Sequence, residues 1–219
     1  MSQHFSDIDY FSLRYINKIK SLNSSYIQPK KLERLKYIYR NSKVNFALNL
    51  KRYKNKKIKY VILGEAPPWS EEGYPRYFYS KIESKLHETF WNTFYSEPIP
   101  KDMNYAYNML AQKQFLLIDS IPYAMNYSPR LRRKEIYNEI IYEFLSNELI
   151  KINDKIAFND DLKIAFAFRL NGMAIIKAFN GSIKIGNNVS YLCETNIAAD
   201  GTGFPKKNKL KHIFELEDK

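Results

Sequence analysis

The chain has 219 residues, 45% of them hydrophobic, a length that suits one well-buried domain and is short for two. Its 35 lysines and arginines outnumber 23 acidic residues and give a formal charge of +12, which favours a polyanionic partner such as nucleic acid, although basic charge also serves solubility alone. The lack of a run of about 18 apolar residues, and of the residue order of a signal peptide, predicts a cytoplasmic protein without membrane contact, and we expect a monomer.

Two helices are predicted before the first strand. Apolar residues recur at helical spacing over residues 7–22. A second helix is predicted from Pro29 through residue 50, because proline is favoured in the first turn of a helix. We interpret residues 1–55 as a helical extension packed on a single domain that spans residues 1–219.

Strands and helices alternate in the rest of the chain. Buried-strand patterns occupy residues 59–64, 115–122, 162–168 and 189–195. Helical patterns lie between them at residues 104–113, 132–151 and 170–180. This alternation predicts an α/β fold in which a mainly parallel, four-stranded sheet is the middle layer of a three-layer α/β/α sandwich. Cys193 falls in the last of these strands, where we expect it to be buried.

Ligands of such sheets bind outside the carboxyl ends of the strands, which directs attention to four loops. These loops are residues 65–79, 119–130, 169–172 and 195–209. Neither a P-loop nor a Gly-x-Gly-x-x-Gly fingerprint follows the first strand, which disfavours a nucleotide-handling enzyme. One cysteine and three histidines without zinc-site spacing predict no metal and no cofactor.

The loop after the first strand, residues 64–80, reads GEAPPWSEEGYPRYFYS. Here the chain resembles the uracil-DNA glycosylase superfamily, most nearly the family 4-like branch, whose first motif reads GEAPG followed by an acidic pair. Four residues match this motif, namely Gly64, Glu65, Ala66 and Pro67. Pro68 replaces the last glycine, Glu71 and Glu72 supply the acidic pair, and the iron–sulfur cysteines of that branch are missing, which makes the chain a divergent member. A proline turn with solvated acids is the alternative interpretation.

The resemblance implies hydrolysis of an N-glycosidic bond in DNA, with water as the nucleophile and an abasic site as the product. Breaking this bond develops positive charge on the sugar, which a nearby carboxylate stabilises. The candidates are Glu65, Glu71 and Glu72. By resemblance Glu65 holds the loop or the attacking water and Glu71 aligns with the acid after the motif, and the choice between them stays open.

The same resemblance implies that the flipped base stacks on an aromatic residue beyond the motif, either Tyr77 or Phe78. Ala66, Pro67 and Pro68 are expected to contact the base as well. Because aromatic residues make up 16% of the chain, a place in the core is the alternative for either ring.

Asp119 lies where the resemblance implies an asparagine that ends the second strand and reads uracil. Asn126 resembles the asparagine of the Asn-Arg-x-Pro element that follows this strand in the family 4-like branch. An ionised carboxylate offers only acceptors, and cytosine presents an amino donor where uracil presents an oxygen. Asp119 is therefore predicted to act in catalysis by reading a cytosine-derived base. Removal of ordinary cytosine would destroy the cell's own genome, so we expect a modified one. A helix-capping role, or a salt bridge to Arg130 or Arg132, is the alternative.

The last loop lacks the histidine with which the superfamily stabilises the departing base. Gly201, Thr202 and Gly203 occupy this loop, and their backbone amides or the threonine hydroxyl are predicted to replace the missing histidine as hydrogen-bond donors. Phe204 is predicted to fill the vacated base stack or, alternatively, to pack inside the protein. Basic side chains are predicted to contact phosphates, unless they are only solvated. They are Arg130, Arg132, Arg133, Lys206, Lys207, Lys209 and Lys211.

These patterns predict a DNA glycosylase that flips and excises a cytosine-derived, 5-substituted base from double-stranded DNA. DNA repair and antiviral defence against phages with such bases both fit this activity. The alternatives are a uracil-DNA glycosylase of base-excision repair and a catalytically inactive member of the fold that only binds DNA.

Overall fold

The computed structural model describes residues 29–80, 84–124, 135–201 and 203–216. A parallel sheet in the order β2-β1-β3 forms its centre. The strands are β1 (Lys57–Gly64), β2 (Phe115–Asp119) and β3 (Ala157–Phe166). The prediction of an α/β fold with a parallel sheet between helices is confirmed.

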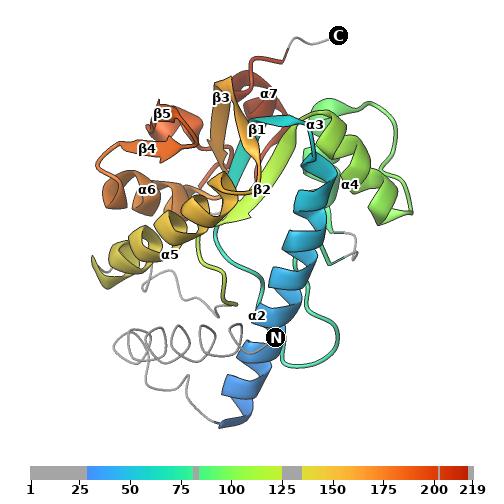
Figure 1. Ribbon diagram of the computed structural model, residues 1–219, viewed down its shortest axis with the longest axis vertical. Coiled ribbons are helices and arrows are strands. Elements are labelled where there is room, and N and C mark those ends of the chain that lie inside the picture. The colour runs from blue at the N-terminus through green and yellow to red at the C-terminus, as the bar shows by residue number, and fades with distance from the viewer. Residues whose placement is uncertain (1–28, 81–83, 125–134, 202, 217–219) are drawn as a thin grey trace.

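Helices flank this sheet on both sides (Figure 1). One side carries α5 (Glu135–Asn153) and α6 (Arg169–Ala178). The other carries α3 (Lys85–Phe94) and α4 (Met103–Gln112), and α7 (Lys207–Ile213) packs near α3. Val61, Ile62 and Leu63 of β1 are fully buried although neighbouring side chains point to opposite faces, which is expected of a strand covered on both faces.

The four-stranded sheet is not present in the described part of the chain. Residues 189–195 were expected to add the fourth strand, but β5 (Asn188–Tyr191) pairs antiparallel with β4 (Ser182–Ile185) in a separate two-stranded sheet. The turn between them contains Gly186 with φ +61°, which permits this local hairpin. At the edge of β3, a single parallel bridge between the described residues Phe166 and Ile197 occupies the place of a fourth strand.

Cys193 is exposed, which corrects the expectation of a buried strand position. The chain leaves β5 two residues earlier and forms a short 3-10 helix, η4 (Glu194–Asn196), with Cys193 at its N-cap. Leu192 is the residue of this segment that is buried, at 4% exposure. A local turn therefore replaces the strand that the apolar pattern predicted.

The long helix α2 (Pro29–Leu50) begins and ends where the sequence predicts, and a 3-10 turn, η2 (Lys51–Tyr53), follows it. Its buried side chains join the same core as the sheet, and they include Leu35, Ile38, Phe46 and Leu50. Its first half reaches beyond the sheet, beside the loop that follows β1 (Figure 1). This position brings α2 to the carboxyl ends of the strands, where ligands bind in such folds.

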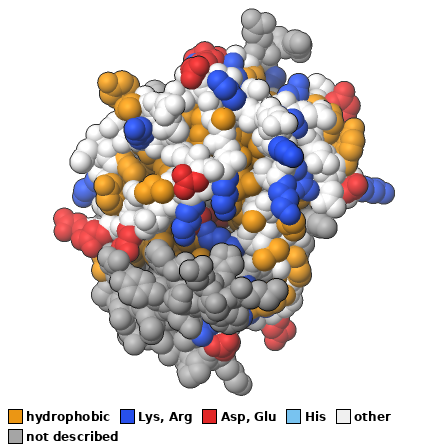
Figure 2. Space-filling view, viewed as in Figure 1, with side chains coloured by type: hydrophobic (Ala, Val, Ile, Leu, Met, Phe, Trp, Pro, Cys, Tyr) orange, Lys and Arg blue, Asp and Glu red, His pale blue; other side chains and the backbone are white. Residues whose placement is uncertain are grey.

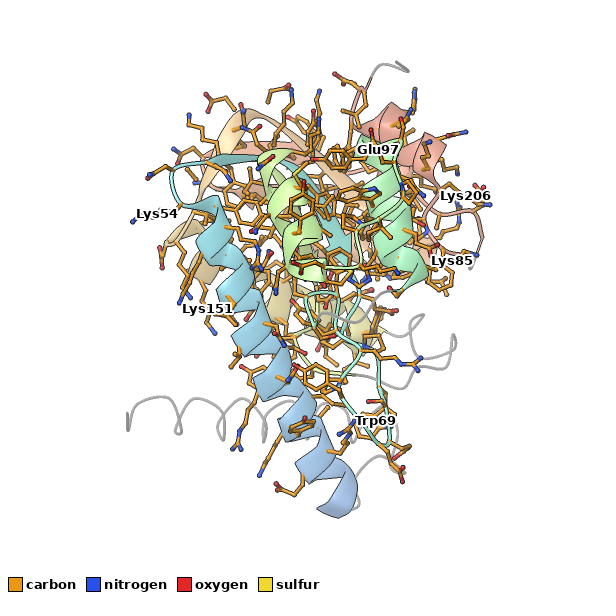
Figure 3. The ribbon with its side chains drawn as sticks, turned by 90° about the vertical axis from the view of Figure 1, so that its right-hand side faces the viewer. Lys54, Trp69, Lys85, Glu97, Lys151 and Lys206 are labelled. Carbon is orange, nitrogen blue, oxygen red and sulfur yellow. The ribbon has the colours of Figure 1, made fainter. Side chains whose placement is uncertain are left out.

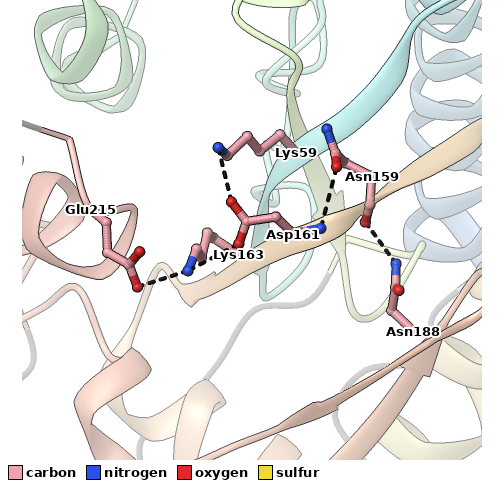
Figure 4. Close-up of polar contacts among 6 residues, drawn as sticks. All are labelled: Lys59, Asn159, Asp161, Lys163, Asn188 and Glu215. Carbon is pink, nitrogen blue, oxygen red and sulfur yellow. Dashed lines mark hydrogen bonds and ion pairs between the residues drawn. The ribbon is translucent and has the colours of Figure 1, made fainter.

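At the opposite ends of the strands, an exposed charge network joins β1, β3 and the residues after α7 (Figure 4). Asp161 of β3 accepts from Lys59 at 3.0 Å and from Lys163 at 3.2 Å, and Lys163 also lies 2.7 Å from Glu215. Exposed pairs of this kind contribute little to stability. Lys and Arg side chains are spread over the face in Figure 2 and form no single continuous strip there.

No helix in the described residues is both long and apolar enough to span a membrane.

Candidate functional site

Two carboxyl groups meet where β1 and β2 end. Gly64 and Asp119 are paired in the register of these strands, so Glu65 leaves the sheet beside Asp119. A β-carbon at position 64 would lie 2.5 Å from Oδ1 of Asp119, which shows that the carboxyl group lies close over the α-carbon of Gly64. The amide of Ile121 donates to the carbonyl oxygen of Glu65 at 2.9 Å and fixes the two loops to one another.

Both carboxyl groups line a cavity of about 510 Å³. Most of its wall is apolar or aromatic, formed by Ala66, Pro68, Tyr77, Phe78, Leu86, Leu117, Phe168 and Phe204. The other polar side chains of the wall are Arg76, Ser84 and His87. An apolar wall with a few converging polar groups is typical of a small-molecule site, and a bare pyrimidine leaves room in this volume.

Asp119 has a strongly perturbed carboxyl group. Burial and, to a smaller extent, the charge of Glu65 raise the pKa of its carboxyl group to about 7, against the opposing effect of the ammonium group of Lys43. No described residue donates a hydrogen bond to this carboxyl group. Asp119 is partly buried, and it presents to the cavity a carboxyl group that ionises near neutral pH.

Glu65 is held rigidly beside it. The side chain is 8% exposed, and the hydroxyl group of Tyr137 in α5 donates to its Oε1 at 2.6 Å. The buried hydroxyl is a neutral donor, so it orients the carboxylate and adds no charge. Sequence reasoning missed Tyr137, because only the packing of α5 brings it to the end of β1.

His87 forms a part of the wall that the sequence did not indicate. Its Nε2 lies 2.5 Å from the carbonyl oxygen of Phe78, which only accepts, so Nε2 carries the proton. Its Nδ1 then accepts from Oγ of Ser84 at 2.7 Å. Burial lowers the pKa of His87 to about 4, so the ring is neutral at pH 7.

The two predicted base-stacking residues are both in the wall. Tyr77 and Phe78 are each 5% exposed and both line the cavity. The ring of Phe78 stacks on His87 with centroids 4.3 Å apart and an interplanar angle of 8°. The position of either ring is therefore compatible with both roles that the sequence left open, which are core packing and contact with a ligand. Pro67 lines a smaller cavity next to Tyr77.

Glu71 and Glu72 lie away from this cavity. Both are exposed, and Glu71 accepts from the indole of Trp69 at 3.0 Å at the far tip of the loop (Figure 3). Arg34 of α2 holds this tip by four hydrogen bonds of 2.7–2.9 Å, including bonds to the carbonyl oxygens of Ser70 and Glu72. Of the three glutamates that the sequence left as candidates, Glu65 is the one that lines the cavity.

The predicted DNA-contact residues lie partly at the rim. Phe204 is 49% exposed, with its ring centroid 6.2 Å from that of Phe168 and 5.7 Å from Nζ of Lys85. Lys85 and Lys206 lie on the same side of the molecule (Figure 3), and Lys207, which follows Lys206 in the chain, is exposed. Gly201 and Gly203 are exposed, and φ of +55° at Gly201 suits a glycine.

Some predicted residues fall outside the described part of the chain. They are Asn126, Arg130, Arg132, Arg133 and Thr202. Lys209 is described and forms an ion pair with Asp200, which reduces the positive charge it offers to a phosphate.

The described residues contain no group of three or more histidine, cysteine, aspartate or glutamate side chains that could hold a metal ion. The chemistry that the arrangement offers is that of two neighbouring carboxyl groups, one of which ionises near neutral pH and one of which a tyrosine orients. Such a pair suits general acid–base work or stabilisation of a developing cation. No protein family, curated protein or solved structure matches the chain.

Proposed function

We propose that this protein is a DNA glycosylase with a uracil-DNA glycosylase-like fold, and that it excises a 5-substituted, cytosine-derived base by hydrolysis. One observation carries the proposal. The desolvated carboxyl group of Asp119 lies beside Glu65 in the wall of a largely apolar cavity, at the carboxyl ends of adjacent parallel strands. The motif that resembles the superfamily supplies Glu65, and Asp119 is the last residue of the neighbouring strand β2.

Glu65 faces the sugar in this proposal. Cleavage of the N-glycosidic bond develops positive charge on the sugar, and a carboxylate held by Tyr137 stabilises that charge or orients the attacking water. Glu71 is less suited to this role, because it lies on the exposed tip of the loop. We therefore assign the role to Glu65.

Asp119 reads the base. In its ionised form it accepts from the N4 amino group of cytosine and is repelled by the O4 atom of uracil. In its neutral form it also donates, and a proton given to the ring nitrogen stabilises the base as it departs. The volume of the cavity beyond a bare pyrimidine is the space for a substituent at position 5.

The rim of the cavity suits an extruded nucleotide. The flipped base stacks on Phe78 or Tyr77, and Phe204 enters the space that the base leaves in the duplex. Lys85, Lys206 and the net charge of +12 attract the phosphate backbone.

A uracil-DNA glycosylase is the second candidate, and the pKa of Asp119 favours it as well. A neutral carboxyl group donates to O4 of uracil and accepts from its N3–H, as an asparagine amide does. With a pKa of about 7, Asp119 is neutral in a large fraction of molecules at pH 6. The pH dependence of base choice therefore separates the two candidates.

The test incubates the protein with matched duplexes that contain cytosine, uracil, 5-hydroxymethylcytosine or its glucosylated form, at pH 6 and pH 8. Alkali then converts abasic sites to strand breaks. We expect breaks in modified-cytosine DNA at both pH values, and none in Glu65→Gln. Breaks in uracil DNA that fade at pH 8 would establish the second candidate. Binding without breaks in any duplex would refute both and leave a DNA-binding fold.

A further inference from the structure

A partly buried ion pair lies next to Asp119. Lys43 of α2 and Glu148 of α5 form this pair, and both residues line a second cavity, of about 20 Å³. Asp119 and Tyr77 line this small cavity and also the large one, so they separate the two. The small cavity has room for about one water molecule and none for a substrate.

The ion pair is held from several directions. The side chains of Lys43 and Glu148 are 28% and 10% exposed. The ammonium group of Lys43 lies 5.8 Å from the ring centroid of Tyr39, and Lys151 approaches the other oxygen of Glu148 at 3.9 Å. Desolvation makes a buried ion pair a poor source of stability compared with apolar side chains of the same size, so its position beside Asp119 points to a role at the site.

We propose that Lys43 is a positioning residue, whose ammonium group is the counter-charge that sets the charge state of Asp119, and that Glu148 keeps this ammonium group protonated and in place. The proposal rests on the proposed function, in which the charge state of Asp119 decides how the base is read and protonated. Lys43 itself touches neither the base nor the sugar.

The electrostatics around Asp119 support this role. Glu65 faces Asp119 from the end of β1, Tyr77 from the loop, Lys43 from α2, and Glu148 lies behind Lys43 on α5. Glu65 raises the pKa of Asp119 and Lys43 lowers it. Burial raises the pKa of Tyr77 well above its usual value, so this residue stays neutral. Lys43 is thus the described cation that acts on Asp119.

Glu148 has a matching effect on Lys43. Burial lowers the pKa of the Lys43 ammonium group, and the charge and hydrogen bond of Glu148 raise it again. Without Glu148, Lys43 would lose its proton more readily and with it the effect on Asp119. Removal of either partner is therefore expected to move the ionisation of Asp119 in the same direction, toward higher pH.

The experiment measures that ionisation directly, by the carbon-13 chemical shift of the Asp119 side-chain carboxyl group as a function of pH. The variants are Lys43→Met, Lys43→Arg, which keeps the charge, and the double variant Lys43→Met with Glu148→Gln, which removes both charges of the pair. Lys36→Met is the matched control, because it removes the same charge from α2 where Lys36 pairs with Glu33 at 3.2 Å.

We expect the midpoint of Asp119 to move to higher pH in Lys43→Met and in the double variant, and to stay in place in Lys43→Arg and Lys36→Met. An unchanged midpoint in the folded double variant would overturn the proposal. This result does not depend on any activity, so it is separable from failure of the proposed function, which the absence of strand breaks would show.

Excision kinetics supply the second readout. The pH profile of kcat/KM should contain the ionisation of Asp119, which is identified by its absence in Asp119→Asn. In Lys43→Met this ionisation should move to higher pH, as the midpoint measured by NMR does. A shifted NMR midpoint with an unshifted kinetic profile would refute the role of Lys43 in the reaction. A loss of activity that is equal at all pH values would do the same, since a merely structural residue gives that result.

Discussion

Asp119→Asn should make the protein more stable, and more so as the pH rises. The pKa of Asp119 is about 7 in the folded protein against 3.8 for the ordinary group, so the folded state binds a proton that the unfolded state lacks between these values. Stability is therefore lost as the pH rises from 3.8 to 7. The difference of about 3 pKa units, at ~1.4 kcal/mol each, corresponds to about 4 kcal/mol above pH 7.

The asparagine keeps the size and the polarity of the side chain but does not ionise. The free energy of unfolding of Asp119→Asn should exceed that of the wild type at pH 8 by up to about 4 kcal/mol, and this gap should be about 2–3 kcal/mol smaller at pH 5. Solvent at the mouth of the cavity reduces both values. Urea unfolding followed by circular dichroism at both pH values measures the gap, with equal m-values as the condition for comparison.

Asp161→Asn is the control for this prediction. Asp161 is an exposed carboxylate whose bonds to Lys59 and Lys163 lower its pKa, so its charge is complete at both pH 5 and pH 8. The gap between Asp161→Asn and the wild type should not change between these values. An Asp119→Asn gap that is equally constant would refute the inference that Asp119 is desolvated in the folded protein.

Three further changes test the wall of the cavity and its loop. His87→Asn should remove a contribution of up to about 3 kcal/mol that is lost as the pH falls from 6.5 to 4, because His87 has a pKa of about 4 in the folded protein, so the variant should gain stability relative to the wild type over this range, measured by urea unfolding. Gly64→Ala should leave the unfolding temperature nearly unchanged but displace the carboxyl group of Asp119, and its effect on excision should vanish in an Asp119→Ala background. Arg34→Ala should expose the loop of residues 65–80 to limited proteolysis, because it removes the four hydrogen bonds at the tip.

The parallel sheet was predictable because its strands are continuous apolar runs. Residues 61–63 and 116–118 read as buried strands whatever surrounds them, and burial on both faces follows from that composition. The separate hairpin in place of the fourth strand was not predictable, because the apolar pattern of residues 189–195 is the same for a hairpin as for a parallel strand. Helix α3 was missed, although the spacing of Leu86, Phe90 and Phe94 is helical.

The site was predictable only where it follows from strand ends. Glu65 and Asp119 were found because the resemblance to the superfamily placed motif residues at the ends of the first two strands, and parallel strands end at the same edge. Lys43, Tyr137 and His87 escaped prediction, because each belongs to a helix whose packing against that edge depends on the whole fold. No local signal in the sequence indicates those contacts.

Asp119 and His87, which both line the large cavity, oppose each other in their effect on stability. Between pH 4 and pH 6.5, a rising pH gains stability through His87 and loses it through Asp119, so the wild type should show only a shallow dependence there. Substitution of either residue exposes the slope of the other. A group that destabilises the native state at the pH of the cell, in contact with a cavity and without a donor among the described residues, is costly for a structural residue. That cost is the reason to propose that the carboxyl group of Asp119 serves a ligand.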